Sequence, residues 1–285
     1  MEHINLLGSQ ISHSLSPCIH NEIYKYLAMP WEYSLMDIKD PKKAEAFIKC
    51  SCYKACNVTT PYKQLAFECA DIKTTTAQVC RGANLLIPTA EGIYADNLDG
   101  QGLLFFLKFK KVEVAKKSIV VCGTGPTSKS IACACFQEGG QVVMLSRSRE
   151  KAKSTMNVLL KYGYNIPVFT YEESKELLQV ADVIIDASPV GMNIEDDPVF
   201  NTKYINQKQC IVDAVYGKGE TKLLKQARQK EARAYNGEGM LLGQAVLTIK
   251  RIAEVSRQSL DITNEEMFLR MQSAISDHKN ATKRI

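Results

Sequence analysis

One stretch decides the fold: SIVVCGTGPTS, at residues 118–128. Its first five residues are almost continuously apolar and rich in β-branched side chains, which is typical of a parallel strand buried on both faces. A turn with glycines at 123 and 125 follows, and a helical pattern begins at Ser128. A strand that passes through a glycine-rich turn into a helix predicts the first unit of an α/β fold.

The same alternation continues toward the C-terminus. Further strands are predicted at 141–145, 166–169, 181–185 and 210–214, and helices at 150–162 and 172–178. Strands and helices that alternate at this spacing predict a doubly wound parallel sheet. Ligands of such sheets bind at the carboxyl ends of the strands.

The residues before 118 also mix strands and helices, with longer polar loops. Strands are predicted at 4–7, 31–36, 55–58, 84–87 and 93–95, and helices at 16–27 and 102–109, before a basic segment at 108–117. Helical patterns at 240–255 and 264–275 end the chain. We expect these last helices to return to the first part of the chain.

The composition is that of an ordinary globular protein. The chain has 285 residues, 45% hydrophobic and 24% charged, which excludes a wholly disordered, collagen-like or coiled-coil chain and suggests two domains with function in a cleft between them. The net charge of +5 is spread along the chain, so it favours anionic small molecules and does not indicate a nucleic-acid partner. No apolar run approaches the ~18 residues of a membrane span.

Ten cysteines raise the question of disulfides and metals. The residues at 1–4 do not resemble a signal peptide, so we expect reduced thiols and a cytoplasmic protein. The spacing of Cys50, Cys52 and Cys56 does not match the paired C-x₂-C of a zinc site, and only four histidines are present. No metal site is predicted.

The glycine-rich turn indicates a dinucleotide. Gly123 permits the tight turn, Gly125 lets the backbone approach a pyrophosphate, and the following helix offers free N–H donors. Ser128 replaces the third glycine, so the motif is weak alone and depends on its strand–helix context. Cofactor contacts are expected from the whole turn: Gly123, Thr124, Gly125, Pro126 and Thr127.

The cofactor is predicted to be NADP(H). The second strand ends in Ser146-Arg147-Ser148-Arg149, where NAD-binding folds carry a carboxylate. Guanidinium groups bind a 2′-phosphate through charge-assisted hydrogen bonds. The alternative is two arginines on a solvated helix start, but cations there oppose the helix dipole.

Three polar stretches before residue 101 are not explained by helix or strand patterning: GSQISHSLSPCIHN at 8–21, NVTTPYK at 57–63 and DNLDG at 96–100. Ser14 and Ser16 can donate hydroxyl hydrogens to an anion, and Ser16 is also expected to cap a helix. Lys63 is placed in the first turn of a helix, where a cation is disfavoured, so a paired or functional lysine is expected. On the apolar C-terminal helix, Gln244 is the residue whose burial most needs a hydrogen-bond partner.

Simpler interpretations remain open for these residues. Asn57 and Thr59 could end a strand and cap a helix. Lys63 and Asp99 could form a surface ion pair, or not meet at all. His13 and His20 are expected to be structural or surface histidines.

These motifs, in this order, resemble the shikimate dehydrogenase family over nearly the whole chain. The resemblance rests on S-x-S-P-x-x-H-N at 14–21, N-V-T-x-P-x-K at 57–63, D-N-x-D-G at 96–100, the later G-x-G, S-R-S in place of N-R-T, DASPVGM at 186–192, V-Y at 215–216 and GMLLGQA at 239–245. It implies an oxidoreductase acting on CH–OH groups, which reduces 3-dehydroshikimate to shikimate with NADPH in chorismate and aromatic amino-acid biosynthesis. Two departures are Pro126-Thr127 in the turn and the absence of the usual proline after Val215-Tyr216.

The resemblance also implies domains and roles. We predict a substrate-binding catalytic domain at 1–105, an NADP-binding Rossmann domain at 106–237, and helices at 238–285 that return to the first domain. Reduction of a ketone needs a proton donor, for which Lys63 is predicted, with Asp99 orienting it and tuning its pKa. Substrate contacts are implied for Ser14, Ser16, Thr59, Lys63, Asn84, Asp99, Tyr216 and Gln244. Further cofactor contacts are implied for Ser146, Arg147, Ser148, Arg149, Ala187, Ser188, Pro189, Gly191, Val215, Gly237 and Met240.

Three alternatives remain at this stage. The chain could be a quinate or quinate/shikimate dehydrogenase that uses NAD, which Arg147 and Arg149 disfavour. It could be a catalytically silent relative that binds metabolites, which the presence of both Lys63 and Asp99 disfavours. It could also be another two-domain α/β dehydrogenase. Small molecules are the only partners expected, with no nucleic acid and no membrane, and the sequence leaves a monomer and a homodimer open.

Overall fold

The computed structural model describes residues 2–217 and 219–282, and the chain divides into two compact α/β units. Unit 1 contains residues 1–98 and 241–285, and unit 2 contains residues 99–240. Each unit holds a six-stranded sheet flanked by helices. The predicted α/β class with two domains is confirmed.

Unit 1 has a mixed sheet with the strand order β2-β1-β3-β5-β6-β4. The first three strands are parallel, and β5 runs antiparallel to both β3 and β6. Its strands are β1 Glu2–Gly8, β2 Trp31–Asp37, β3 Ala55–Val58, β4 Ile72–Lys73, β5 Leu85–Thr89 and β6 Gly92–Asp96. Its helices are α1 Ser16–Tyr26, α2 Pro41–Cys50, α3 Lys63–Cys69, α4 Thr75–Cys80, α11 Asn264–Thr282 and most of α10 Glu238–Val255.

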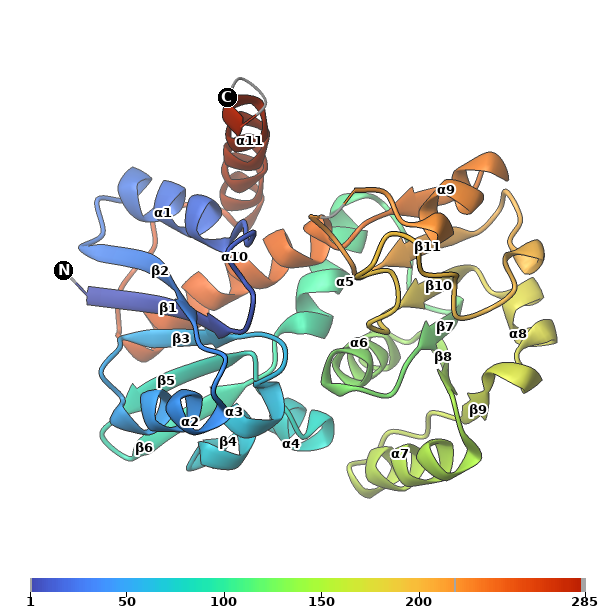
Figure 1. Cartoon of the computed structure of the whole chain (residues 1–285), viewed down its shortest axis with the longest axis horizontal. Helices are drawn as coiled ribbons and strands as arrows, with labels where there is room; N and C mark the ends of the chain where they lie inside the picture. Colours follow the sequence, from blue (N-terminus) through green and yellow to red (C-terminus); the bar gives the residue numbers. More distant parts are fainter. Residues whose placement is uncertain (1, 218, 283–285) are drawn as a thin grey trace. The chain divides into compact units, whose positions relative to one another are not determined.

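Both faces of this sheet are covered (Figure 1). Cys56 and Val58 of β3 pack with Ile48 of α2 and Ala66 of α3 in one apolar cluster. Asn57 lies between them in the strand and therefore points to the opposite face. There its Nδ2 donates to Thr248 Oγ1 of α10 at 3.2 Å. A helix from the end of the chain thus completes the unit that begins it.

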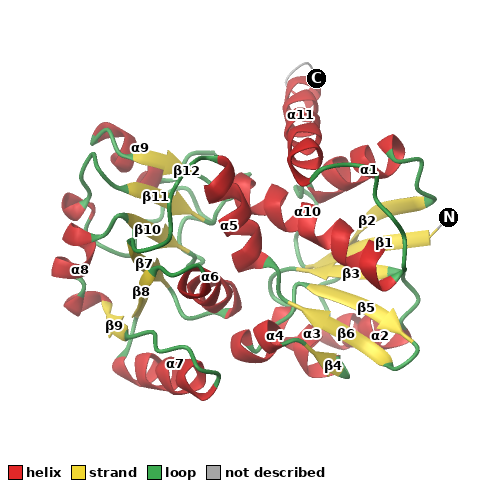
Figure 2. Cartoon of the chain, turned by 180° about the vertical axis from the view of Figure 1, so that it is seen from behind, coloured by secondary structure: helices red, strands yellow, loops and turns green. Residues whose placement is uncertain are grey.

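Unit 2 has a wholly parallel sheet with the order β12-β11-β10-β7-β8-β9. In chain order this is 6-5-4-1-2-3, the order of the Rossmann fold, with its topological switch point between β7 and β10. The strands are β7 Ser118–Cys122, β8 Gln141–Ser146, β9 Val168–Thr170, β10 Val183–Asp186, β11 Cys210–Asp213 and β12 Arg233–Tyr235. The helices are α5 Asp99–Phe109, α6 Pro126–Gln137, α7 Arg149–Lys161, α8 Lys175–Val180 and α9 Lys222–Gln229. Helices α8 and α9 pack on one face of the sheet, as Figure 2 shows.

Several predicted elements differ from the observed ones. The helix predicted at 102–109 begins at Asp99, and the helix predicted at 172–178 is a 3₁₀ helix at Tyr171–Glu173 followed by α8. That break follows from Ser174, whose hydroxyl donates to the carbonyl of Tyr171 at 2.6 Å. The short or polar elements α2, α4, α9, β4 and β12 were not predicted, because few apolar positions mark them.

Gly100 lies where α5 crosses α6. A Cβ atom on Gly100 would lie 2.1 Å from the carbonyl oxygen of Ser130, and the Gly100 N–H donates to Ser130 Oγ at 2.9 Å. We expect Gly100→Ala to lower the free energy of unfolding by about 1–3 kcal/mol, because two backbones must separate. Urea denaturation would measure it, with Gly125→Ala as control, since a Cβ there meets nothing within 4 Å. Equal midpoints for the two variants would contradict the expectation.

Candidate active site

The polar loops of unit 1 meet at one edge of its sheet. Because β1 and β3 are parallel neighbours, their carboxyl ends lie together, and the Ser9 N–H donates to the carbonyl of Thr60 at 3.2 Å. Strand β5 runs the other way, so its first residues lie at the same edge, where Leu85 pairs with Asp96 at the end of β6. The structure therefore brings five of the predicted substrate residues to one edge: Ser14, Ser16, Thr59, Lys63 and Asn84.

Ser14 and Ser16 form a hydroxyl pair, with 3.2 Å between their Oγ atoms. The prediction that Ser16 caps the helix is wrong. Helix α1 begins at Ser16 itself, the N-cap residue Leu15 makes no side-chain cap, and the Ser16 N–H donates to Ser14 Oγ at 3.2 Å. Pro17 follows in the first turn, where its missing N–H costs nothing.

Lys63 is held through its backbone. It is the first residue of α3, after a turn in which the Tyr62 N–H donates to the carbonyl of Thr59 at 2.9 Å. The Thr60–Pro61 peptide bond in this turn is cis. The Lys63 carbonyl accepts from the Ala83 N–H at 2.8 Å, so the same segment also touches the approach to β5. The start of α3 as predicted is confirmed.

Asn84 is oriented by the segment that precedes Asp99. Its Oδ1 accepts from the Leu98 N–H at 2.8 Å, which fixes Nδ2 as the donor end of the amide. Its backbone N–H donates to the carbonyl of Asp96 at 3.0 Å, and Asn97 Nδ2 donates to the carbonyl of Gly82 at 3.0 Å. The D-N-x-D-G motif therefore orders a predicted substrate residue.

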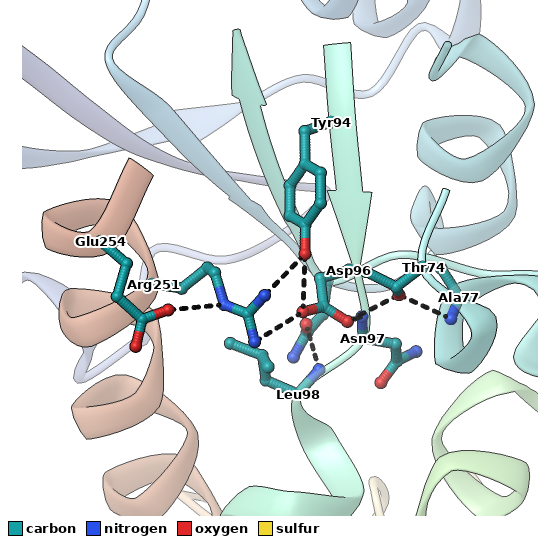
Figure 3. Close-up of polar contacts among 9 residues, drawn as sticks. Thr74, Ala77, Tyr94, Asp96, Asn97, Leu98, Arg251 and Glu254 are labelled. Carbon is teal, nitrogen blue, oxygen red and sulfur yellow. Dashed lines mark hydrogen bonds and ion pairs between the residues drawn. The ribbon is translucent and has the colours of Figure 1, made fainter. Parts of the chain in front are cut away.

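Asp96 is a buried carboxylate. It is the first residue of the D-N-x-D-G motif, but its structural role was not predicted from the sequence. Figure 3 shows its partners. Its Oδ1 accepts from Thr74 Oγ1 and from the Asn97 N–H, both at 2.8 Å, and its Oδ2 lies 3.6 Å from Arg251 Nη2 of α10. Arg251 Nη1 also donates to the Tyr94 hydroxyl at 2.8 Å. The pKa of Tyr94 is raised to about 12 by burial and by the Asp96 charge, so its phenol stays protonated.

Removing this carboxylate should weaken unit 1. We expect Asp96→Ala to lower the free energy of unfolding by about 2–3 kcal/mol, because three hydrogen bonds to a charged group, from Thr74, Tyr94 and the Asn97 N–H, are lost along with the contact to Arg251. The matched control is Glu254→Ala, which removes an exposed partner 3.4 Å from the same arginine and should cost less than ~1 kcal/mol. Equal losses for both variants in chemical denaturation would show that burial of Asp96 is unimportant.

Gln244 was predicted to be buried, and this prediction is wrong. It is half-buried, and its Nε2 donates to the Leu241 carbonyl one turn earlier in α10 at 3.0 Å. Gln244 is one turn before Thr248, and residues four apart share a helix face. Thr248 contacts Asn57, so Gln244 lies on the face of α10 that is turned toward the unit-1 sheet.

His20 is structural, as expected. It is fully buried, its Nδ1 lies 3.1 Å from the Tyr24 hydroxyl, and its ring stacks on Tyr33 with 4.1 Å between centroids. Among the described residues, nothing forms a hydrogen bond with its Nε2. Burial lowers the pKa of His20 from 6.5 to about 3.

This histidine predicts an acid sensitivity. Between these two pKa values His20 is protonated in the unfolded state and neutral in the folded state. The free energy of unfolding therefore falls as the pH drops below 6.5. At pH 4.5 the His20 contribution amounts to about 2–3 kcal/mol. The difference in unfolding free energy between the wild type and His20→Phe, measured from pH 7 to pH 4.5, should shift by this amount in favour of the variant. A constant difference would contradict it.

The residues of unit 2 that were predicted to contact the cofactor follow the carboxyl ends of its strands. The turn at 123–127 follows β7, Ser146 ends β8 ahead of residues 147–149, the loop at 187–191 follows β10, and Val215 follows β11. Ser128 Oγ donates to the carbonyl of Ala187 at 3.1 Å, and the Gly237 N–H donates to the carbonyl of Val215 at 3.1 Å. Tyr216 and Met240 are half-buried. Of the predicted substrate residues, Asp99 and Tyr216 belong to this unit.

The two arginines after β8 have different surroundings. Both are exposed, but Arg149 Nη2 lies 3.5 Å from Glu173 Oε1. Ser148 caps α7 by accepting from the Lys151 N–H at 3.3 Å. Arg147 is therefore better placed than Arg149 to accept an anion.

Asp99 lies beside the glycine-rich turn. Its side chain is 4% exposed, and its Oδ2 accepts from Thr127 Oγ1 at 2.8 Å. The structure thus joins a predicted catalytic residue to a predicted cofactor residue within unit 2.

The roles of two buried carboxylates in unit 2 were not predicted, although each ends a buried strand and Asp186 is the first residue of the DASPVGM motif. Asp186 and Asp213 are paired in register at the ends of β10 and β11. They accept from the N–H groups of Ser188 at 2.9 Å and Val215 at 3.0 Å, and so shape two loops that were predicted to contact the cofactor. Burial and the neighbouring Asp213 raise the pKa of Asp186 to about 6.

Two findings bear on other classes of site. In residues 2–217 and 219–282, no cluster of three or more His, Cys, Asp or Glu side chains could hold a metal ion. Over the same ranges, no helix has the length and apolar character required to cross a bilayer.

A Rossmann unit with a glycine-rich turn and basic residues after its second strand, combined with a second α/β unit rich in polar strand ends, defines a dinucleotide-dependent oxidoreductase. The comparisons with known proteins agree. Residues 6–86 match the family described as the shikimate dehydrogenase substrate binding domain. The chain is 31% identical to the shikimate dehydrogenase (NADP(+)) of Aquifex aeolicus, over 86% of this chain and 88% of that protein.

Another relative and a solved structure give the same result. The shikimate dehydrogenase (NADP(+)) of Carboxydothermus hydrogenoformans is 28% identical over 88% of this chain and 91% of its own. The crystal structure of shikimate dehydrogenase from Aquifex aeolicus superposes with a TM-score of 0.83 at 28% identity, covering 96% of this chain and 97% of the other. The chain belongs to the shikimate dehydrogenase family, as the sequence motifs predicted.

Proposed function

We propose that this chain catalyses the reversible, NADPH-dependent reduction of 3-dehydroshikimate to shikimate, a step of aromatic amino-acid biosynthesis. The observation that carries this is the edge of the unit-1 sheet, which gathers hydroxyl groups, an oriented amide and one lysine. Hydroxyls and amides suit a polyhydroxylated carboxylic acid, and an ammonium suits the proton transfer. The relatives named shikimate dehydrogenase (NADP(+)) support the same substrate and cofactor.

The residues of unit 2 fit NADP(H). Gly125 precedes α6 without a side-chain cap, and the space beside it is open, so N–H donors at the helix start remain available to a pyrophosphate. Arg147 would hold the 2′-phosphate. When bound, the nicotinamide supplies the hydride.

In this proposal Lys63 delivers the proton to the alkoxide oxygen and Asp99 orients the lysine, while Ser14 and Ser16 bind the substrate carboxylate. Residues 1–98 with the C-terminal helices hold the substrate, and residues 99–240 hold the cofactor. A cytoplasmic location, and a monomer or a homodimer, remain predictions.

The test is a steady-state assay of shikimate and quinate, each with NADP and with NAD. Shikimate with NADP should give the highest kcat/KM. A preference for NAD with quinate would favour a quinate dehydrogenase instead. If no substrate-dependent reduction of either nucleotide occurred at high enzyme concentration, the chain would be a metabolite-binding relative without activity.

A further inference from the structure

Two of the ten cysteines have a setting that the proposed function does not use. Cys50 is the last residue of α2, and Cys52 follows two residues later. Ser51 between them is the C-cap and has a φ of 51°, so the chain turns sharply there. Among the described cysteines, Cys50 and Cys52 are the exposed ones, whereas Cys18 and Cys69 are half-buried and the other six are buried.

The sharp turn brings the two cysteines together, with the sulfur of each in contact with the backbone of the other. Cys50 Sγ accepts from the Cys52 N–H at 3.3 Å, and Cys52 Sγ donates to the Cys50 carbonyl at 3.3 Å. A hydrogen bond between the two side chains is the first cause that raises the pKa of Cys52. The Cys50 sulfur therefore accepts a backbone N–H donor, whereas the single hydrogen of the Cys52 thiol is directed at the Cys50 carbonyl. We therefore assign Cys50 as the attacking sulfur, which reacts as the thiolate.

We propose that Cys50 and Cys52 form a reactive dithiol that a low-molecular-weight disulfide, such as oxidised glutathione, converts to an intramolecular disulfide. The Cys50 thiolate attacks one sulfur of the small disulfide, whose S–S bond breaks and releases one thiolate. Cys52 then loses its proton to solvent and attacks the Cys50 sulfur, which releases the second small thiolate. Two electrons pass from the cysteine pair to the small disulfide.

The attack of Cys52 on the Cys50 sulfur should be faster than the reaction of Cys52 with a second molecule of oxidised glutathione. The Cys52 sulfur is already in contact with Cys50, so its attack is intramolecular and does not depend on encounter with a molecule from solution. The proposal needs no active site and is independent of the function proposed above.

The chain offers a convenient readout. Lys49 and Lys54 flank the pair, so trypsin releases CSCYK, residues 50–54, which holds both sulfurs and no other cysteine. Native protein is incubated with oxidised glutathione, its free thiols are blocked, and it is digested with trypsin. The mass of this peptide is then measured by mass spectrometry. The expected product is the peptide that has lost two hydrogens, restored by dithiothreitol.

Single variants test the order of events. Cys52→Ser should accumulate one glutathione on Cys50, because the resolving thiol is missing. Cys50→Ser should be modified at least tenfold more slowly, because the nucleophile is missing. Cys69→Ser is the control for the nearest half-buried thiol and should leave the oxidised peptide unchanged.

Three results would overturn the proposal. They are a wild-type peptide that carries stable glutathione adducts, a crosslink from Cys50 or Cys52 to the Cys69 peptide, and an unmodified peptide under conditions that oxidise a small dithiol. Each is read by mass alone, so loss of catalytic activity in a variant does not affect the outcome.

Discussion

Lys63→Ala is expected to lower kcat for shikimate oxidation by about 10²–10⁴-fold, the range that a positioned proton donor or acceptor contributes. The KM for shikimate should change much less, because in the proposed mechanism serine, threonine and amide groups at the same sheet edge bind the ring and carboxylate without Lys63. The fold should persist, since the structure holds Lys63 through its backbone carbonyl, which alanine also provides.

The matched control is Lys42→Ala, which removes an exposed lysine from α2 in the same unit. It should keep the turnover and the thermal midpoint of the wild type. A Lys63→Ala enzyme with wild-type kcat would show that the proton comes from another group. A variant with raised KM and unchanged kcat would assign Lys63 to binding alone.

Arg147→Ala is expected to raise the Kd for NADP by about 10–100-fold, because a hydrogen bond between charged groups contributes about 1.5–3 kcal/mol. The reason is the 2′-phosphate, so the Kd for NAD should stay nearly constant. Titration of the intrinsic fluorescence or calorimetry with each nucleotide would measure both constants.

Arg149→Ala is the comparison. Its guanidinium already lies 3.5 Å from Glu173, so its removal should weaken NADP binding less than removal of Arg147. If Arg147→Ala affected NADP and NAD equally, the arginine would not distinguish the 2′-phosphate. If Arg149 gave the larger effect, Glu173 would have to release it on binding.

Much of the fold was predictable because apolar runs mark buried parallel strands. The strands at Ala55–Val58 and Ser118–Cys122 are observed as predicted, since most of their side chains are apolar and buried. Helix α9 was missed because the sequence KLLKQARQ buries only one narrow face, which depends on tertiary packing. The first residue of a helix, such as Asp99 in α5, depends on local hydrogen bonds, which the spacing of apolar residues does not reveal.

The sequence predicted which residues gather at the candidate site, but it did not predict the hydrogen-bond partners that orient them. Motifs pointed to Asn84 and Lys63, but the partners that orient them are remote in sequence, as with Asp96 and Arg251. The expected cap at Ser16 failed because the helix already includes Ser16, whose own N–H is a donor that Ser14 Oγ accepts. The expected burial of Gln244 failed because helix periodicity does not show how deeply each position packs.

The path of the chain has a consequence for the order of synthesis. Residues 99–240 are one continuous segment, and the ribosome completes them before it makes most of α10. Unit 1 is the first to be synthesised, but it cannot complete its folding early. Its residues Asn57 and Asp96 have their partners Thr248 and Arg251 in α10, which is synthesised later. We therefore expect the nascent chain to fold its Rossmann unit early, while the sheet of unit 1 keeps one face uncovered until α10 emerges. A cell making this protein has to protect residues 1–98 until α10 has been synthesised.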